Sequence, residues 1–203
     1  MTAIIPRQRL LLVLNLIAFQ LAWFACVLGA ARGVPAWGSA AVAAAVLLQL
    51  VVSDARLADL ALLIAAPALG LVWDTALLRA DVVVYASPGP VLGWAPGWIL
   101  ALWALFATTL REPLRWLHGR WLLAAVVGGA AGALSYWSAA RLGAARIPDV
   151  PLALGVLAAG WAVMTPGLLA LAGWLEARVK GRAGAAASAR TAPTRAWSRT
   201  GGR

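Results

Sequence analysis

Charged residues divide this chain into long uncharged stretches, and the lengths of these stretches predict its helices. A helix needs roughly 20 apolar residues to cross about 30 Å of hydrocarbon. Five stretches reach that length: residues 10–31, 33–53, 60–78, 121–140 and 150–175. Only one charge, that of Asp74, falls inside them. We therefore predict a transmembrane helix in each.

The region between residues 82 and 110 is longer than one crossing and contains Pro88, Pro90 and Pro96. Proline is well tolerated at the first position of a helix, because its missing N–H would have no partner there anyway. We therefore expect a further span from about Pro96 to residue 110. Residues 81–95 are predicted to form an extended or interfacial hairpin.

Together these stretches predict an all-α fold, a polytopic transmembrane helix bundle of about six spans that covers residues 10–177. Residues 1–9 would form a short cytoplasmic N-terminus. Residues 178–203 are rich in Gly, Ala, Ser and Arg and lack apolar periodicity, which predicts a disordered basic cytoplasmic tail. The short links leave no room for a soluble domain.

The basic residues predict the orientation of the bundle. With six spans, 13 Lys and Arg residues fall on one side and four on the other, out of 17 in the chain. The positive-inside rule then places both termini in the cytoplasm. Many of the 12 tryptophans lie near predicted span ends, where an indole is most favourable.

The first span has a rival interpretation as a cleaved signal peptide. Basic residues precede it, and Gly29-Ala30-Ala31 offers small residues for cleavage. The apolar run is long for a signal peptide, however, and cleavage would leave five spans with a basic terminus on each side. We therefore expect the span to be retained.

Composition excludes a water-soluble protein, because 63% of the residues are hydrophobic, 12% are charged and the mean hydropathy is +0.85. The formal charge of +10 would suggest nucleic acid in a polar chain. Here the basic residues lie between apolar runs and in the tail, so we expect contact with lipid headgroups and no nucleic acid. Cys26 is the one cysteine, so an intramolecular disulfide is impossible.

Residues able to carry chemistry are few. His118 is the one histidine, and the sequence contains no phosphate-binding loop and no motif typical of a metal site. We expect no metal and no cofactor, and we assign no catalytic residue. The sequence favours a protein that is not an enzyme, although it does not decide the point.

Asp74 is the most informative residue, because a carboxylate inside a span is costly and rarely faces lipid. Gly70 lies on the same helical face, which lets another helix approach closely. Residues 128–136 supply a candidate neighbour, with glycines at GxxxG spacing and polar groups at the same depth. We predict a polar cluster of Asp74, Ser135, Tyr136 and Arg141 under a rim of Trp73, Trp94 and Trp98. Two roles remain open for it, a hydrogen-bonded helix staple and a ligand or proton site.

A set of short strings occurs in order along the chain, among them Trp23-Phe24-Ala25-Cys26, Ala95-Pro96-Gly97-Trp98 and Leu134-Ser135-Tyr136. Over residues 10–175 the chain thereby resembles a family of small proteobacterial inner-membrane proteins of unknown function. That family has proline at the position of Ala133 and glycine at that of Ala139. The resemblance implies no established activity. Genes of the family are often found near relatives of cyclopropane-fatty-acid synthase, which implies an association with lipid modification.

Three functional hypotheses follow for a multi-pass protein of the bacterial cytoplasmic (inner) membrane. The first is a non-catalytic accessory protein of envelope lipid metabolism, whose expected partners are membrane lipids, with another membrane or lipid-modifying protein as a further candidate. The second is a small transporter or permease that uses Asp74 and the neutral polar residues Asn15, Gln20 and Gln49. The third is an intramembrane lipid-modifying enzyme that uses Asp74 with Ser135 and Tyr136.

Overall fold

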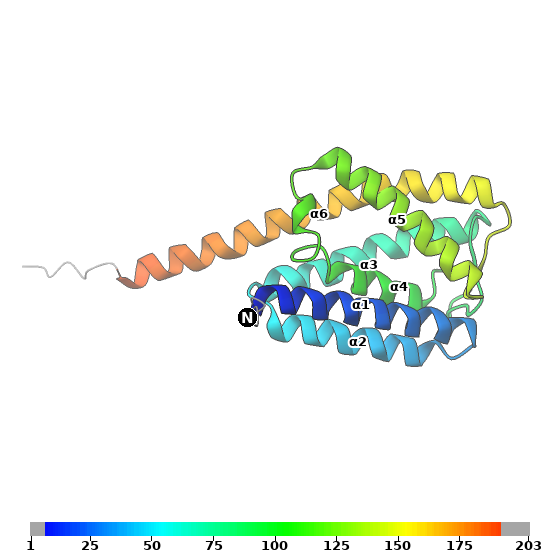
Figure 1. Cartoon of the computed structure of the whole chain (residues 1–203), viewed down its shortest axis with the longest axis horizontal. Helices are drawn as coiled ribbons and strands as arrows, with labels where there is room; N and C mark the ends of the chain where they lie inside the picture. The colour runs from blue at the N-terminus through cyan, green and yellow to red at the C-terminus, as the bar shows by residue number, and fades with distance from the viewer. Residues whose placement is uncertain (1–6, 192–203) are drawn as a thin grey trace, which may run out of the picture.

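Six α-helices form most of the described chain, and they run back and forth along one bundle (Figure 1). The computed structural model describes residues 7–191, with side chains described for residues 13–181. The helices are α1 (Arg7–Ala31), α2 (Pro35–Val52), α3 (Arg56–Arg79), α4 (Gly97–Ala107), α5 (Trp121–Arg141) and α6 (Val150–Thr191). Residues 1–6 of the predicted N-terminal segment lie outside the described residues.

Five of these helices, all except α4, are long and apolar enough to cross a membrane. Their outward faces expose large apolar side chains, such as Ile64, Val72 and Leu122. A soluble monomer rarely exposes contiguous apolar surface of this extent. Helices whose backbone groups bond within the helix are suited to hydrocarbon. The chain is therefore a multi-pass helical membrane protein.

Helix α4 is shorter than the span predicted over residues 96–110. Its 11 residues extend about 16 Å at 1.5 Å per residue, so the helix covers only part of the hydrocarbon thickness, and the turns after it bring Arg111 to the α2–α3 link at the opposite end of the bundle. The hydroxyls of Thr108 and Thr109 bond to the carbonyls of Leu105 and Phe106, and Pro113 follows, so the helix stops early. Turns and a 3-10 helix (Arg115–Leu117) then lead the chain to α5.

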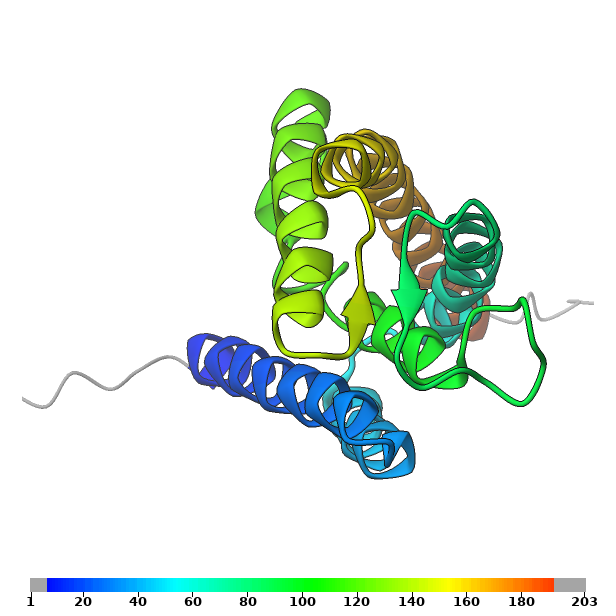
Figure 2. The ribbon, with the colours of Figure 1, turned by 90° about the vertical axis from the view of Figure 1, so that its right-hand side faces the viewer.

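The links gather at two ends of the bundle (Figure 1). The hairpin end holds residues 32–34, 80–96 and 142–149. The strands β1 (Val84–Tyr85) and β2 (Ala145–Arg146) pair there as an antiparallel ladder, side by side in Figure 2. The expected hairpin within residues 81–95 is therefore a pairing between two different links. This pairing buries the side chain of Tyr85 against the bundle.

The opposite end, which we name the Arg111 end, holds residues 53–55 and 108–120. Arg111 is 1% exposed and bonds through Nη1 to both carboxylate oxygens of Asp59, at 3.1 and 3.0 Å. Its Nη2 bonds to Asp54 at 2.6 Å, and Glu176 of α6 lies 3.7 Å from its Nε. The hydrogen bond from Arg111 lowers the pKa of Asp54 below its ordinary value of 3.8. One guanidinium thus ties α3, α6 and the α2–α3 link to the irregular chain after α4.

Helix α6 extends beyond the predicted sixth span. It continues to Thr191, so residues 178–191 of the predicted disordered tail are helical, and the prediction is corrected for that segment. Alanine-rich sequence favours a helix intrinsically. The rest of the predicted tail, residues 192–203, lies outside the described residues.

The small residues of α5 pack against α6, where α5 makes most of its helix contacts. A Cβ added to Gly132 would lie 2.1 Å from the Trp161 ring, and one added to Gly128 would lie 2.2 Å from the Thr165 hydroxyl. The GxxxG face therefore does not meet α3, which was its expected neighbour. Helices α1 and α2 form a second close pair, in which Gly38 lies on the backbone of α1.

Candidate functional site

Asp74 lies on α3 with no exposed surface and accepts three hydrogen bonds. Oδ1 accepts from the hydroxyl of Tyr85 at 2.5 Å and from that of Tyr136 at 2.6 Å. Oδ2 accepts from Trp103 Nε1 at 2.6 Å. The donors come from β1, α5 and α4, so one carboxylate joins three segments to α3.

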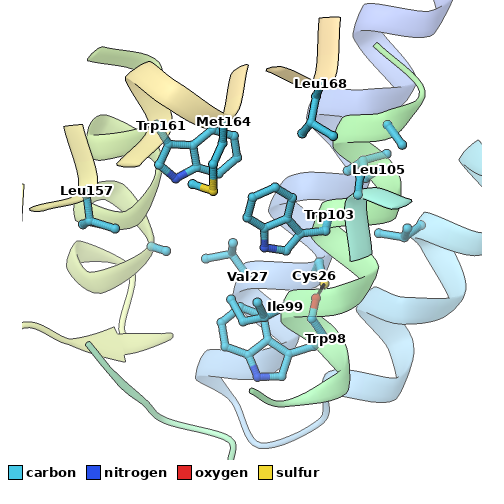
Figure 3. Close-up of a cluster of buried hydrophobic side chains, with 14 of the residues drawn as sticks. Cys26, Val27, Trp98, Ile99, Trp103, Leu105, Leu157, Trp161, Met164 and Leu168 are labelled. Carbon is cyan, nitrogen blue, oxygen red and sulfur yellow. Dashed lines mark hydrogen bonds between the residues drawn. The ribbon is translucent and has the colours of Figure 1, made fainter. Parts of the chain in front are cut away.

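Local packing explains how Trp103 reaches this carboxylate. Gly70 lies one turn before Asp74 on α3, and a Cβ added there would lie 2.2 Å from Trp103 Cδ1. The indole therefore occupies the space that glycine leaves. Its other face stacks on Trp161 of α6, with ring centroids 4.8 Å apart and planes 11° apart (Figure 3). This stack connects the Asp74 cluster to the core between α4 and α6.

The structure brings Tyr136 to Asp74 but gives the other two members of the predicted cluster different partners. Ser135 accepts a hydrogen bond from Trp23 Nε1 at 3.2 Å, which joins α5 to α1. The guanidinium of Arg141 lies over the ring of Trp137, 5.9 Å from its centroid. In the described part of the chain neither Ser135 nor Arg141 bonds to Asp74.

The three tryptophans of the predicted rim also separate. Trp98 is 3% exposed and donates to the carbonyl of Ser87 at 3.0 Å, so it belongs to the interior. Trp94 is half exposed and lies under Arg79 at the hairpin end. Trp73 packs its ring against Gly160 of α6. These residues do not form one rim over Asp74.

Sequence reasoning missed Tyr85 and Trp103 as partners of Asp74, and Trp161 as the ring behind Trp103. Tyr85 follows a run of three valines, which signalled an extended segment but not its direction. Gly70 signalled a close neighbour for α3 without identifying it. Asn15 and Gln49, considered for a transport path, bond to each other at 2.8 Å and link α1 to α2.

A cavity of about 880 Å³ lies beside this cluster, bounded by α1, α4, α5, α6 and the α4–α5 link. Eleven of the 17 aromatic residues of the chain line it, including all three phenylalanines and both tyrosines. Phe19, Trp23 and Phe24 come from α1, and Trp98, Trp103 and Phe106 from α4. The volume falls within the roughly 300–1,000 Å³ typical of ligand pockets.

The cavity opens sideways between α1 and α5. Leu16, Gln20 and Phe24 are spaced four residues apart on one face of α1 and reach the cavity, as does Leu134 on α5. Leu16 and Leu134 are also exposed on the apolar exterior, which places the mouth at the level of the membrane-spanning helices. Toward the hairpin end the Trp23–Ser135 hydrogen bond bridges the two helices.

Asp74 itself does not line this cavity, whereas Tyr85, Tyr136 and Trp103 do. Both carboxylate oxygens are occupied by side chains of the protein, so the carboxylate holds three aromatic residues of the cavity wall in place. The thiol of Cys26 is buried and donates to the Trp98 carbonyl. Among the described residues, no group of three His, Cys, Asp or Glu side chains is arranged to hold a metal ion.

The fold and the site thus define a multi-pass helical membrane protein with an aromatic cavity that opens toward the bilayer. Residues 12–167 match the model of a family described as "Protein of unknown function (DUF2878)", and because this match covers more than half of the chain, the chain belongs to that family. Comparison with curated proteins finds no match, and comparison with solved structures finds none either.

Proposed function

We propose that the protein binds a membrane lipid in the cavity between α1 and α5, as a non-catalytic accessory protein of envelope lipid metabolism in the bacterial inner membrane. The observation that carries the proposal is the cavity of about 880 Å³, whose wall is apolar and rich in aromatic residues and whose mouth lies among lipid-facing side chains. Such a wall suits a hydrocarbon ligand that enters from the bilayer.

Apolar exposure at the mouth favours a lipid over a water-soluble ligand. Leu16 and Phe24 of α1 and Leu134 of α5 are 51%, 42% and 59% exposed and continue into the cavity. A lipid chain that moves from the bilayer into the cavity keeps apolar neighbours throughout. A polar solute would lose its hydration on this route without gaining enough hydrogen bonds in return.

The bonding of Asp74 supports a binding role over a catalytic or transport role. Its two oxygens accept hydrogen bonds from Tyr85, Tyr136 and Trp103, so the carboxylate holds these parts of the cavity wall in place. The resemblance described for the sequence adds the proposed association with lipid modification. A membrane or lipid-modifying protein would then be the partner that receives or supplies the lipid, and nucleic acid has no part in this function.

A pair of matched substitutions on α5 tests the cavity. Both Ala130 and Ala131 are exposed, but Ala131 lines the cavity and its neighbour Ala130 lies outside it. Ala131→Trp should therefore fill part of the cavity, and Ala130→Trp should place the same side chain toward lipid. The purified proteins would be compared by native mass spectrometry and by organic extraction of bound lipid.

We expect the wild type and Ala130→Trp to retain lipid and Ala131→Trp to lose it. Equal lipid in all three proteins, or none in the wild type, would contradict binding in this cavity. The metabolic link has a separate test, because a deletion strain should show an altered membrane lipid profile. A profile identical to that of the parent strain would remove that link.

A further inference from the structure

Two buried polar groups in the cavity wall have no hydrogen-bond partner in the described part of the chain. They are Trp161 Nε1 and Thr165 Oγ1 of α6. The two residues are 9% and 2% exposed, and both line the cavity. A buried donor without an acceptor is costly, so we expect the molecule that fills the cavity to supply one.

The neighbouring donors are already used, since the hydroxyls of Tyr85 and Tyr136 and the indole of Trp103 all donate to a buried carboxylate. An indole N–H can only donate, and a threonine hydroxyl donates as well. Trp161 and Thr165 are four residues apart and thus lie on one face of α6. Together they offer hydrogens to an acceptor oxygen.

The depth of this pair limits the ligands that fit. Trp161 and Thr165 lie 11 and 15 residues beyond Val150, where α6 begins, or about 16 and 22 Å along the helix at 1.5 Å per residue. Glu176, in the charged cluster at the Arg111 end, lies 15 and 11 residues beyond them, so both residues lie near the middle of the segment and away from the edges of a hydrocarbon core about 30 Å thick. A phospholipid with its phosphate at the membrane surface keeps its ester groups at the edge of the hydrocarbon, away from this pair.

The distribution of charge on the cavity wall also favours a ligand without an ionised headgroup at this depth. Arg141 is the one charged residue among the described side chains that line the cavity, and it lies at the hairpin end, where α5 stops. Nothing charged faces Trp161 or Thr165 from the rest of the lining. An ionised headgroup would therefore enter the middle of the cavity without a counter-ion, at a high desolvation cost.

We infer that the cavity selects an uncharged lipid that carries an acceptor oxygen, such as an ester carbonyl, a ketone or a hydroxyl, and binds that oxygen at Trp161 Nε1 and Thr165 Oγ1. This inference rests on the proposed lipid-binding function and adds the class of lipid. The two groups act as the specificity-determining residues of an otherwise apolar site.

Three brominated probes test the inference, because bromine quenches tryptophan fluorescence and six tryptophans line the cavity. The probes are the methyl ester of dibromostearic acid, the dibrominated alkane of the same chain length, and a phosphatidylcholine with dibrominated chains. The full chain in dodecyl maltoside micelles would be titrated with each. The wild type should bind the ester about 2- to 10-fold more tightly than the alkane, the effect expected of one or two neutral hydrogen bonds.

Thr165→Val keeps the shape of the side chain and removes its hydroxyl, so it should weaken binding of the ester by about 2- to 10-fold and leave the alkane unchanged. Thr165→Ser retains a hydroxyl and should bind the ester as the wild type does. Thr108→Val is the matched control, because Thr108 is buried outside this cavity and its hydroxyl already bonds to the Leu105 carbonyl.

Equal affinity of the wild type for ester and alkane, or an equal loss of both in Thr165→Val, would overturn the inference while leaving the lipid-binding function in place. Tighter binding of the phosphatidylcholine than of the methyl ester would also overturn it, because the preferred lipid would then carry an ionised headgroup. Absence of quenching by all three probes would instead reject the proposed function itself.

Discussion

Replacing Asp74 by asparagine should destabilise the bundle, because three donors converge on its side chain. A carboxylate offers two acceptor oxygens, whereas an amide offers one oxygen and an NH₂ group that donates. If the amide oxygen keeps the two tyrosine hydroxyls, the NH₂ group faces Trp103 Nε1 and leaves that buried N–H unpaired. The expected loss in free energy of unfolding is about 1–3 kcal/mol.

Cys26 provides the assay, since it is the one cysteine of the chain and is fully buried. A thiol-reactive fluorophore added in detergent will report its exposure as the protein is heated. At 2–4 °C per kcal/mol, the scaling for domains of roughly this size, the midpoint for Asp74→Asn should fall by about 2–12 °C.

A double-mutant cycle isolates the proposed cause. Trp103→Phe removes the N–H that the amide leaves unpaired, so in the Asp74→Asn background it should cost about 1–3 kcal/mol less than in the wild type. Additive costs, or an Asp74→Asn protein as stable as the wild type, would refute the reasoning. The cluster would then not depend on the matching of three donors to two acceptor oxygens.

Three further predictions concern the two ends of the bundle. Arg111→Ala should lower the free energy of unfolding by about 3–5 kcal/mol, because it leaves the carboxylate of Asp59 buried without its cation. Arg115→Ala should lower it by only about 0–1 kcal/mol, because half of that side chain is exposed. The thiol assay will compare the two variants. The pKa of Asp54 is lowered by its hydrogen bond from Arg111, so the stabilisation that Asp54 contributes should be present above pH 3.8 and disappear as the pH falls through the lower folded-state pKa. The melting temperatures of the wild type and Asp54→Asn, compared between about pH 5 and pH 3, should therefore converge on the acid side. A difference in melting temperature that stays constant with pH would contradict this. With both termini cytoplasmic, an alkaline phosphatase fusion after Val84 should be active and one after Arg115 inactive, and the reverse pattern would invert the orientation.

Charge spacing predicts the five long helices well, because hydrocarbon penalises any charge that is not paired or buried. It places α3 four residues late, at residue 60 instead of Arg56. The spacing treated Asp59 as the end of a polar link, yet the structure buries this carboxylate inside the helix. Arg111, 52 residues further along the chain, makes that burial possible, and its position depends on where α4 stops.

The Asp74 cluster shows the same limit. Sequence reasoning could state that the carboxylate needs buried partners, because a charge in a span is costly wherever the helix sits. Tyr136 was among the candidates since it lies at a similar depth in a neighbouring span. Tyr85 and Trp103 are 11 and 29 residues from Asp74 and lie in a link and a shortened helix. Their approach depends on the β1–β2 pairing and on the space beside Gly70.

Hydrophobic length and charge position, read from the sequence alone, determined that this protein is a bundle of membrane-spanning helices with polar groups inside it. Each helix satisfies its own backbone hydrogen bonds, so the elements depend little on one another. The tertiary structure alone decided which faces meet. It paired the glycines of α5 with α6 rather than α3, and it left a space between α1 and α5, which meet through the Trp23–Ser135 hydrogen bond. The cavity between them is a property of packing geometry, because no local segment of the chain carries the information that two distant helices diverge.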